Sequence, residues 1–360
     1  MSANIEKQGE GAVFRMKKLY ESFGYSQYKM KKFEEYDLYV RNKSFLVSDH
    51  IITFTDTNGS LMALKPDVTL SIVKNSPEKE DGIRKVYYNE NVYRVPKGSL
   101  FFKEIMQAGL ECIGELDTYS VAEVLSLAAK SLALISPDYV LDVSHMGIIA
   151  ALVDGMGLST RGRAQILACI GEKNIHGIDT VCLSEGIDVQ GAKTIKSLIA
   201  MRGDSAEMLE ILKDNECYSD ALELAQIIDA LTAQGNRIRV DFSVTDDTNY
   251  YSGIVFKGFI KGIPTSVLSG GRYDNLMKKM GKHSGAIGFA VYLDLLGELD
   301  ENTDEYDTDV LVIYDDKTDV KAICELTDRL TQEGKRVTVK KDKPQRLKYK
   351  ELIDITGEGR

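Results

Sequence analysis

The chain has 360 residues, of which 43% are hydrophobic and 28% charged, and its formal net charge at pH 7 is −10. This length exceeds that at which a single hydrophobic core keeps growing, so two or three domains are expected. The composition is that of an ordinary soluble protein, and the acidic balance argues against broad nucleic-acid binding, which requires a basic surface.

Signals for membranes, secretion and metals are weak. No apolar run approaches the roughly 18 residues of a membrane span, and the N-terminus has no apolar segment of the secretory type. The five cysteines are scattered and form no metal-ligand spacing with the four histidines. We therefore expect a cytoplasmic protein with no disulfide framework, no metal site, no cofactor and no membrane association.

The N-terminal part of the chain predicts a mixture of helices and strands. Residues 11–23 have the apolar spacing of a helix, and an extended stretch through Tyr39 follows. The pair Asn58 and Gly59 favours the tight turn of a hairpin. The hairpin strands, two further strands and the next helix are predicted at residues 51–54, 61–64, 85–93, 101–114 and 118–134.

The middle of the chain, from about residue 142 to 235, is helical in composition. Its amphipathic pieces are separated by glycines and polar turns, and they cover residues 146–156, 162–169, 192–201 and 218–232. Strands are predicted again at 237–243, 250–259 and 265–268. This order favours an α+β fold in which a helical insertion interrupts an antiparallel sheet with flanking helices.

The acidic stretch from 300 to 307 is typical of a linker. Beyond it, a short α/β pattern is predicted, with strands at 310–314 and 336–340 around a helix that Thr318 would cap and Gly334 would end. The sequence therefore predicts a first domain at 1–300, with its insertion at about 142–235, and a short C-terminal α/β domain at 308–360.

The first candidate site residue is Asp67, in the run from Leu64 to Thr69. Pro66 removes a backbone donor and fixes φ, so the strand ends there and presents the next side chains at a sheet edge. Asp67 could then accept hydrogen bonds from a ligand ammonium. Capping of the following helix is an equally good local interpretation.

A second group of candidates lies on the two long predicted strands. Arg94 ends the first strand, while Gln107, Gly109 and Glu111 alternate along the second and therefore face the same side. A glycine between two polar residues predicts a hole with an acceptor on each rim, large enough for a small polar ligand. A surface ion pair for Arg94 and an exposed position for Glu111 are the alternatives.

Two further blocks stand near the end of the first domain. Tyr250 and Tyr251 start a strand and point to opposite faces, so one can pack while the other offers its hydroxyl to a pocket. Gly270 and Gly271, within the run from Leu268 to Leu276, permit close backbone approach or form a simple turn. We interpret Arg272 and Asp274 in this run as structural.

These four blocks, in order and spacing, resemble the histidyl-tRNA synthetase family of class II synthetases, over about residues 10 to 300. The resemblance implies that Asp67 holds the α-amino group of histidine and that Arg94 or Gln107 meets its carboxylate end. Glu111 and one of Tyr250 or Tyr251 would then recognise the imidazole. Thr69, from the same block as Asp67, completes the implied histidine site. No catalytic residue is assigned.

The resemblance is incomplete where ATP would bind. The arginine that active synthetases carry shortly after the Gly288-Phe-Ala290 run is absent from residues 291–296, and residues 244–249 lack the second arginine. The chain is therefore most similar to the regulatory subunits of ATP phosphoribosyltransferase in histidine biosynthesis. That likeness implies a homodimer within a hetero-oligomer, a short-form catalytic subunit as partner, histidine as ligand, and no nucleic acid.

Two alternatives remain beside this interpretation. A divergent histidyl-tRNA synthetase would show histidine-dependent ATP–pyrophosphate exchange, and loss of two cationic groups argues against it. A paralogue that binds another small ligand, or regulates another protein, would not co-purify with a short phosphoribosyltransferase. Lys65 stands where the family has arginine, which changes hydrogen-bond geometry at similar charge.

Overall fold

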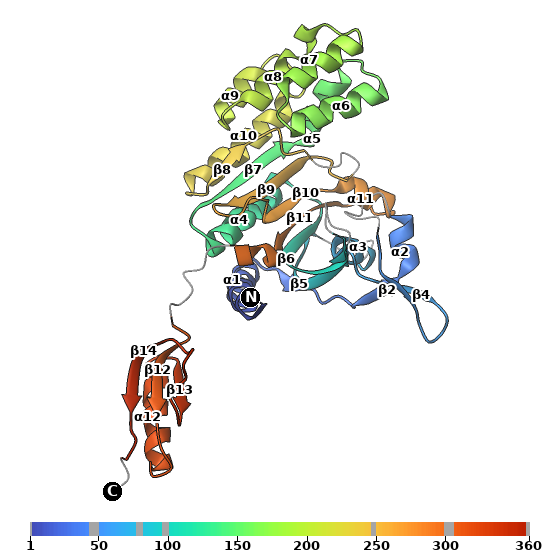
Figure 1. The fold of residues 1–360 in the computed structure, drawn as a ribbon. Helices are drawn as coiled ribbons and strands as arrows, with labels where there is room; N and C mark the ends of the chain where they lie inside the picture. The colour runs from blue at the N-terminus through green and yellow to red at the C-terminus, as the bar shows by residue number, and fades with distance from the viewer. Residues whose placement is uncertain are drawn as a thin grey trace. The chain divides into compact units, whose positions relative to one another are not determined.

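The computed structural model describes residues 2–42, 50–76, 82–95, 101–245, 250–298 and 306–357. The chain divides into two compact units, Met1–Glu298 and Leu299–Arg360 (Figure 1). Each unit has its own sheet and its own hydrophobic cluster. The predicted α+β class, with an antiparallel sheet, flanking helices and a helical insertion, is confirmed.

The first unit is built on an eight-stranded sheet with the order β1-β5-β6-β11-β10-β9-β7-β8. Neighbouring strands are antiparallel except for the pairs β1 with β5 and β7 with β8, which are parallel. The strands are β1 (Ser26–Gln27), β5 (Arg84–Arg94), β6 (Lys103–Gly114), β7 (Tyr139–His145), β8 (Ile238–Val240), β9 (Ile254–Ile260), β10 (Leu268–Arg272) and β11 (Gly285–Tyr292).

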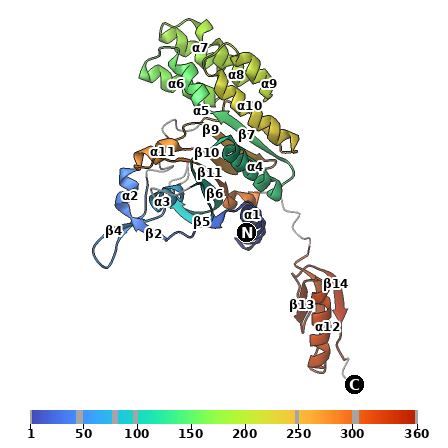
Figure 2. The ribbon, with the colours of Figure 1, turned by 180° about the vertical axis from the view of Figure 1, so that it is seen from behind.

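Helices cover both faces of this sheet. On one face, α1 (Ser2–Ser22) contacts α4 (Thr118–Ile135), and α4 lies against β7, β9 and β11 (Figure 2). On the other face lies α3 (Thr69–Lys74), next to a small antiparallel sheet of order β2-β4-β3. The strands and helices that complete this region are β2 (Phe33–Glu35), α2 (Tyr36–Arg41), β3 (Thr53–Thr55), β4 (Leu61–Leu64), α11 (Asp274–Lys279) and the 3-10 helix η3 (Leu293–Glu298).

The helical insertion connects β7 to β8 (Figure 1). His145 ends β7, and its Nδ1 atom accepts a hydrogen bond from the backbone N–H of Ile148, which caps the first inserted helix. The insertion consists of α5 (Met146–Asp154), α6 (Thr160–Gly171), α7 (Ile175–Ser184), η2 (Val189–Ala192), α8 (Lys193–Ala200), α9 (Ser205–Leu212) and α10 (Tyr218–Ala233).

Four local predictions in this unit are wrong. Residues 36–41 form α2 rather than an extended stretch, and residues 139–145 form β7, which the helical composition of the following block concealed. The strand predicted at 265–268 instead begins at Leu268. The strand predicted at 250–259 begins at Ile254, so Tyr250 and Tyr251 precede it instead of starting it. Of the two alternatives for Gly270 and Gly271, close backbone approach is confirmed: both lie within β10, and a Cβ on either would overlap neighbouring strands or side chains.

Helix α4 also corrects the expectation about apolar runs. Its 18 residues are long and apolar enough, by length and composition, to cross a membrane. In the fold, however, most of the helix is buried against the sheet, and side chains such as Val124 and Leu132 are fully buried. The sequence of α4 is therefore explained by its place in the core.

The second unit has a parallel sheet of order β13-β12-β14 and one helix, α12 (Val320–Gln332). Leu330 of α12 packs with Val310 and Val312 of the central strand. Asp319 caps the helix, and not Thr318 as predicted, because the Thr318 hydroxyl is hydrogen-bonded to Asp315 at 2.8 Å. The strands are β12 (Thr308–Ile313), β13 (Val337–Lys340) and β14 (Tyr349–Asp354), the last of which was not predicted.

A core truncation tests the packing of α4. We expect Leu132→Ala to lower the free energy of unfolding by about 2–5 kcal/mol, because a fully buried leucine leaves a cavity when truncated. Leu134→Ala, at a partly exposed position of the same helix, is the matched control and should cost clearly less. Urea unfolding followed by circular dichroism measures both, and equal losses would contradict this packing.

Candidate functional site

The site centres on the buried carboxylate of Glu111, which is 2% exposed. Its Oε1 atom accepts a hydrogen bond from the Thr69 hydroxyl at 2.8 Å, and its Oε2 atom accepts one from the Tyr273 hydroxyl at 2.6 Å. The three residues come from β6, from the first turn of α3 and from the turn between β10 and α11. One carboxylate therefore joins three segments that are far apart in the sequence.

Glycines on two neighbouring strands make room for the side chains of this site. Glu111 pairs with Gly288 of β11, which in turn pairs with Gly271 of β10. A Cβ on Gly288 would lie 2.5 Å from the Cδ atom of Glu111, and one on Gly271 would lie 2.6 Å from the Cδ1 atom of Tyr251. The backbone of these glycines is thus the floor beneath Glu111 and Tyr251.

The hole predicted above Gly109 is filled. Tyr88 pairs with Gly109 across β5 and β6, and a Cβ on Gly109 would lie 2.6 Å from the Tyr88 hydroxyl. Tyr88 itself is 2% exposed. Gln107 and Glu111 do face the same side as Gly109, as the alternation predicts, but an aromatic side chain separates them instead of an empty space.

Asp67 lies two residues before α3, which begins at Thr69. Its Oδ1 atom accepts a hydrogen bond from the backbone N–H of Leu70 at 2.8 Å, so the helix-capping interpretation describes a contact that is present. Burial raises the pKa of Asp67, and the nearby charge of Arg94 opposes that rise. Arg94 is 7% exposed and lies 5.9 Å from the centre of the Tyr292 ring.

Three tyrosines form one wall of the site. The rings of Tyr250 and Tyr251 are 4.7 Å apart in an edge-to-face arrangement, and those of Tyr250 and Tyr273 are 5.9 Å apart. Burial raises the pKa of Tyr250 and of Tyr273 well above the ordinary value; the charges of Asp67 and Glu111 add to the rise for Tyr250, and that of Glu111 adds to it for Tyr273. These phenols therefore stay neutral and keep their hydrogen-bonding hydroxyls.

The structure places the seven predicted site residues on one face of the sheet or directly above it. Four of these residues interact with one another. The Thr69 hydroxyl donates a hydrogen bond to Glu111, and the charge of Asp67 raises the pKa of both Glu111 and Tyr250. Gln107 is 5% exposed on the same face of β6 and pairs directly with Glu90 of β5 on one side and with Tyr292 of β11 on the other.

Two site residues were missed by the sequence analysis. Tyr273 directly follows the Gly-Gly-Arg run, and its hydroxyl donates a hydrogen bond to Glu111. Tyr88 could have been found from the pairing of the two long strands, because a glycine opposite an aromatic residue indicates that the ring lies over it. Arg272 and Asp274 form an ion pair at 2.9 Å, and Asp274 also accepts a hydrogen bond from the N–H of Ala286.

The charges of the site suit a small zwitterion. Two carboxylates, of Asp67 and Glu111, and one guanidinium, of Arg94, are enclosed among tyrosines. Burial raises the pKa of Glu111 to about 8, while hydrogen bonds from Tyr273 and Thr69 oppose the rise and the charge of Asp67 adds to it. An ammonium fits Asp67, a carboxylate fits Arg94, and an N–H donor fits Glu111.

The chain is similar to known proteins over most of its length. The family model for histidyl-tRNA synthetase matches residues 6–296. The ATP phosphoribosyltransferase regulatory subunit of Caldanaerobacter subterraneus subsp. tengcongensis is 30% identical over 291 residues, which are 78% of this chain and 75% of that relative.

Solved structures show the same fold. The structure described as an ATP phosphoribosyltransferase regulatory subunit/histidyl-tRNA synthetase from Bacillus halodurans has a TM-score of 0.78 at 22% identity and covers 98% of this chain and 95% of its own. A chain of the ATP phosphoribosyl transferase complex from Thermotoga maritima has a TM-score of 0.63 at 18% identity and covers 78% of this chain and 96% of its own.

The pKa of Glu111 predicts a pH-dependent stability. This pKa is about 8 in the folded protein against 4.5 in the unfolded chain, so the folded state binds more protons between these values. The contribution of Glu111 to stability is therefore lost as the pH rises from about 4.5 to 8, by up to about 1.4 kcal/mol per pH unit. We expect Glu111→Gln to remove this slope in urea unfolding at a series of pH values. A slope that the variant leaves unchanged would contradict the assignment.

The glycine floor predicts a position-specific cost. We expect Gly288→Ala to displace the Glu111 side chain and to lower the free energy of unfolding by about 2 kcal/mol or more, because an added methyl group must overlap that carboxylate. Gly253→Ala is the matched control, since the nearest atom to its Cβ would be 3.4 Å away. Thermal unfolding compares the two, and a larger loss for Gly253→Ala would contradict the model of the floor.

Proposed function

The chain belongs to the histidyl-tRNA synthetase family, together with ATP phosphoribosyltransferase regulatory subunits, and on this premise we propose that it is the histidine-sensing regulatory subunit of an ATP phosphoribosyltransferase. In this role it activates a short-form catalytic subunit and conveys feedback inhibition by histidine. It carries out no adenylation itself.

One observation supports the proposal: the residues that we expect to hold the amino acid are present, whereas the two segments in which we expect an arginine for ATP contain none. Asp67, Glu111 and Arg94 are present and buried or partly buried. The residues that follow β11, from 291 to 296, contain no arginine, and neither do residues 244–249. Without these cations, negative charge that develops on a phosphate would have no stabilising partner at these positions.

Histidine would bind with its ammonium at Asp67 and its carboxylate towards Arg94 and Gln107. Its imidazole would reach Glu111, whose two oxygens already face Thr69 and Tyr273. Binding of an imidazole N–H favours the ionised form of Glu111 over the protonated form that burial favours. Tyr250 and Tyr251 would close the remaining side.

Backbone hydrogen bonds connect the segment that follows Tyr250 and Tyr251 to the helical insertion and to β10. The backbone N–H of Met146, the first residue of α5, donates to the carbonyl of Gly253 at 2.8 Å, and the N–H of Ser252 donates to the carbonyl of Arg272 at 2.9 Å. A ligand that moves this segment would therefore move the start of the insertion. Coupling between such sites is commonly about 1–3 kcal/mol.

For the homodimer, we propose the small β2-β4-β3 sheet as the contact surface. Phe33 and Phe54 lie on its outer face with ring centres 4.9 Å apart, and they are 46% and 36% exposed. Adjacent exposed aromatic side chains of this kind are typical of protein interfaces, and a second copy of the chain is the occupant that we propose.

A titration with histidine tests the sensing role. We expect the wild-type chain to bind histidine with an affinity that rises between pH 6 and 8, because the ionised carboxylate of Glu111 is a stronger acceptor for an imidazole N–H than the protonated group. Glu111→Gln should lose about tenfold or more in affinity at pH 8. Glu115→Gln, at an exposed position near the end of the same strand, should bind as wild type. Calorimetry that detects no histidine binding to the wild type would refute this role.

An activity assay tests the regulatory role. The short catalytic subunit, assayed for phosphoribosyl transfer to ATP, should be more active with this chain than without it, and added histidine should reverse the gain. Glu111→Gln should still activate but should respond less to histidine. Histidine-dependent ATP–pyrophosphate exchange by this chain alone would contradict the proposal and favour a divergent synthetase.

A further inference from the structure

Tyr292, the last residue of β11, is fixed at one end of the candidate site. Its backbone N–H donates to the carbonyl of Val267 at 2.8 Å, and its hydroxyl is hydrogen-bonded to that of Ser269 on β10 at 2.7 Å. Gly288, which pairs with Glu111, lies an even number of residues earlier on the same strand. Because side chains alternate along a strand, Tyr292 lies on the face of the sheet that carries Glu111.

The ring of Tyr292 lies beneath the guanidinium group of Arg94. The Cζ atom of Arg94 is 5.9 Å from the ring centre, and the arginine is 7% exposed. A guanidinium group over an aromatic face is attracted by the electrons of the ring, and the attraction is larger where water is excluded. The ring does not use the planar N–H donors, which stay available for a carboxylate. The contact can therefore hold the arginine and leave its donors for a ligand.

Tyr292 also belongs to the segment in which the family resemblance leads us to expect an arginine. Residues 291–296 contain no arginine, and Tyr292 is the aromatic residue among them. A second cation close to Arg94 would repel its guanidinium group, whereas a neutral ring attracts it. The composition of this segment therefore favours the observed position of Arg94.

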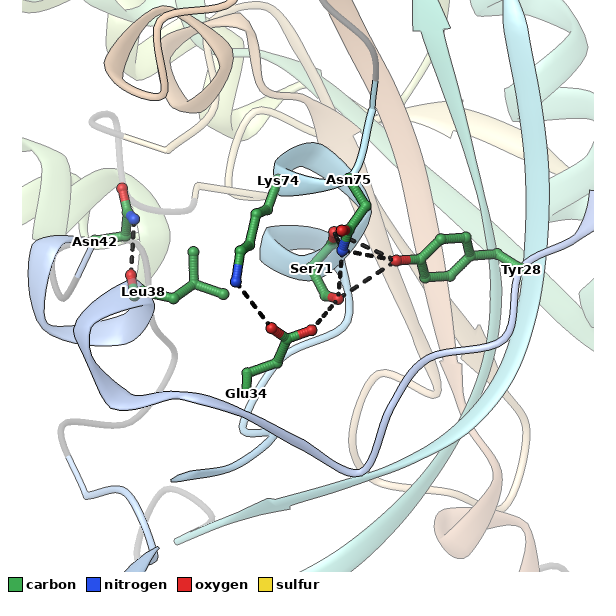
Figure 3. A network of polar contacts seen from close by, with 7 residues as sticks. All are labelled: Tyr28, Glu34, Leu38, Asn42, Ser71, Lys74 and Asn75. Atoms are coloured by element: carbon green, nitrogen blue, oxygen red, sulfur yellow. Dashed lines mark hydrogen bonds and ion pairs between the residues drawn. The ribbon is translucent and has the colours of Figure 1, made fainter. Parts of the chain in front are cut away.

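The ammonium side of the proposed site is held by other contacts. Asp67 precedes α3, and Glu34 of β2 binds that helix through both of its oxygens, as Figure 3 shows. They accept hydrogen bonds from the Ser71 hydroxyl at 3.0 Å and from the Lys74 ammonium at 3.1 Å. These contacts hold the helix next to Asp67, whereas the carboxylate side depends on what holds Arg94.

We propose that Tyr292 is a positioning residue for Arg94: its ring holds the guanidinium group where the carboxylate of a free amino acid binds. This inference rests on the proposed function. An arginine that is held before the ligand arrives loses less side-chain freedom on binding, so the affinity is higher. Ser269 supports the same arrangement from β10, because its hydroxyl fixes the ring.

The proposal distinguishes the ring of Tyr292 from its hydroxyl. Tyr292→Leu removes the aromatic face, and we expect it to bind histidine about tenfold more weakly, as for a cation–π contact that is shielded from water. Tyr292→Met is a second variant without a ring and should behave in the same way. Tyr292→Phe keeps the aromatic face and loses only the hydrogen bond to Ser269, so we expect a loss of about threefold or less.

The experiment compares two ligands on the full-length chain by calorimetric titration. Histamine has the ammonium and the imidazole of histidine but no carboxylate, so Tyr292→Leu should weaken its binding less than about twofold. Tyr93→Phe is the control, because Tyr93 precedes Arg94 on the opposite face of β5 and its hydroxyl donates to Glu104 at 2.9 Å. This control should leave both affinities unchanged. Thermal unfolding of the free proteins shows which variants fold.

Each outcome supports or overturns the proposal. A loss of about tenfold for histidine in the variants without a ring, which histamine does not share, supports it. An unchanged histidine affinity, or an equal loss for both ligands, overturns the role of Tyr292 and leaves the proposed function intact. If histamine binds too weakly for calorimetry, the comparison with Tyr292→Phe decides, because losses equal to those of Tyr292→Leu overturn the role of the ring. A wild-type chain that does not bind histidine overturns both ideas.

Discussion

The buried carboxylate of Glu111 is the constraint on which the rest of the site depends. An acidic group that is 2% exposed must have hydrogen-bond donors, and here they come from α3 and from the turn after β10. Because each donor belongs to a different segment, α3, β6 and the β10–α11 turn must assemble correctly together. Space for the carboxylate exists only because β11 has a glycine beside it.

Much of this architecture could be predicted from the sequence, because the hydrophobic patterns of the long elements are strong. The alternation along β6 correctly indicates that Gln107 and Glu111 share a face. It could not show that Tyr88 fills the space between them, because that depends on how β5 is paired with β6. Strand β7 and helix α2 were not predicted for a similar reason: both are short, and tertiary packing decides their conformation. The histidine-binding roles stay predictions.

The proposed division between recognition and chemistry follows from where the charges lie. Groups that suit an ammonium, a carboxylate and an imidazole N–H are held by the sheet and by α3, which are rigid elements. The two segments in which the family resemblance leads us to expect arginines, 244–249 and 291–296, contain uncharged and acidic residues. Such a site can respond to an amino acid through its loops, as the hydrogen bond between Met146 and Gly253 illustrates, without stabilising a phosphate.

The glycines beneath the site limit how its ligand preference can evolve. Because Gly109 has no side chain, the ring of Tyr88 can occupy the space above it, and Gly271 makes room for the ring of Tyr251 in the same way. A larger residue in place of the glycine is tolerated only if the aromatic residue over it is replaced by one that is smaller by the same volume. Paralogues that acquire a new ligand are thus expected to show covariation between these glycines and the rings above them, so that a joint exchange, and no isolated substitution, opens a differently shaped cavity.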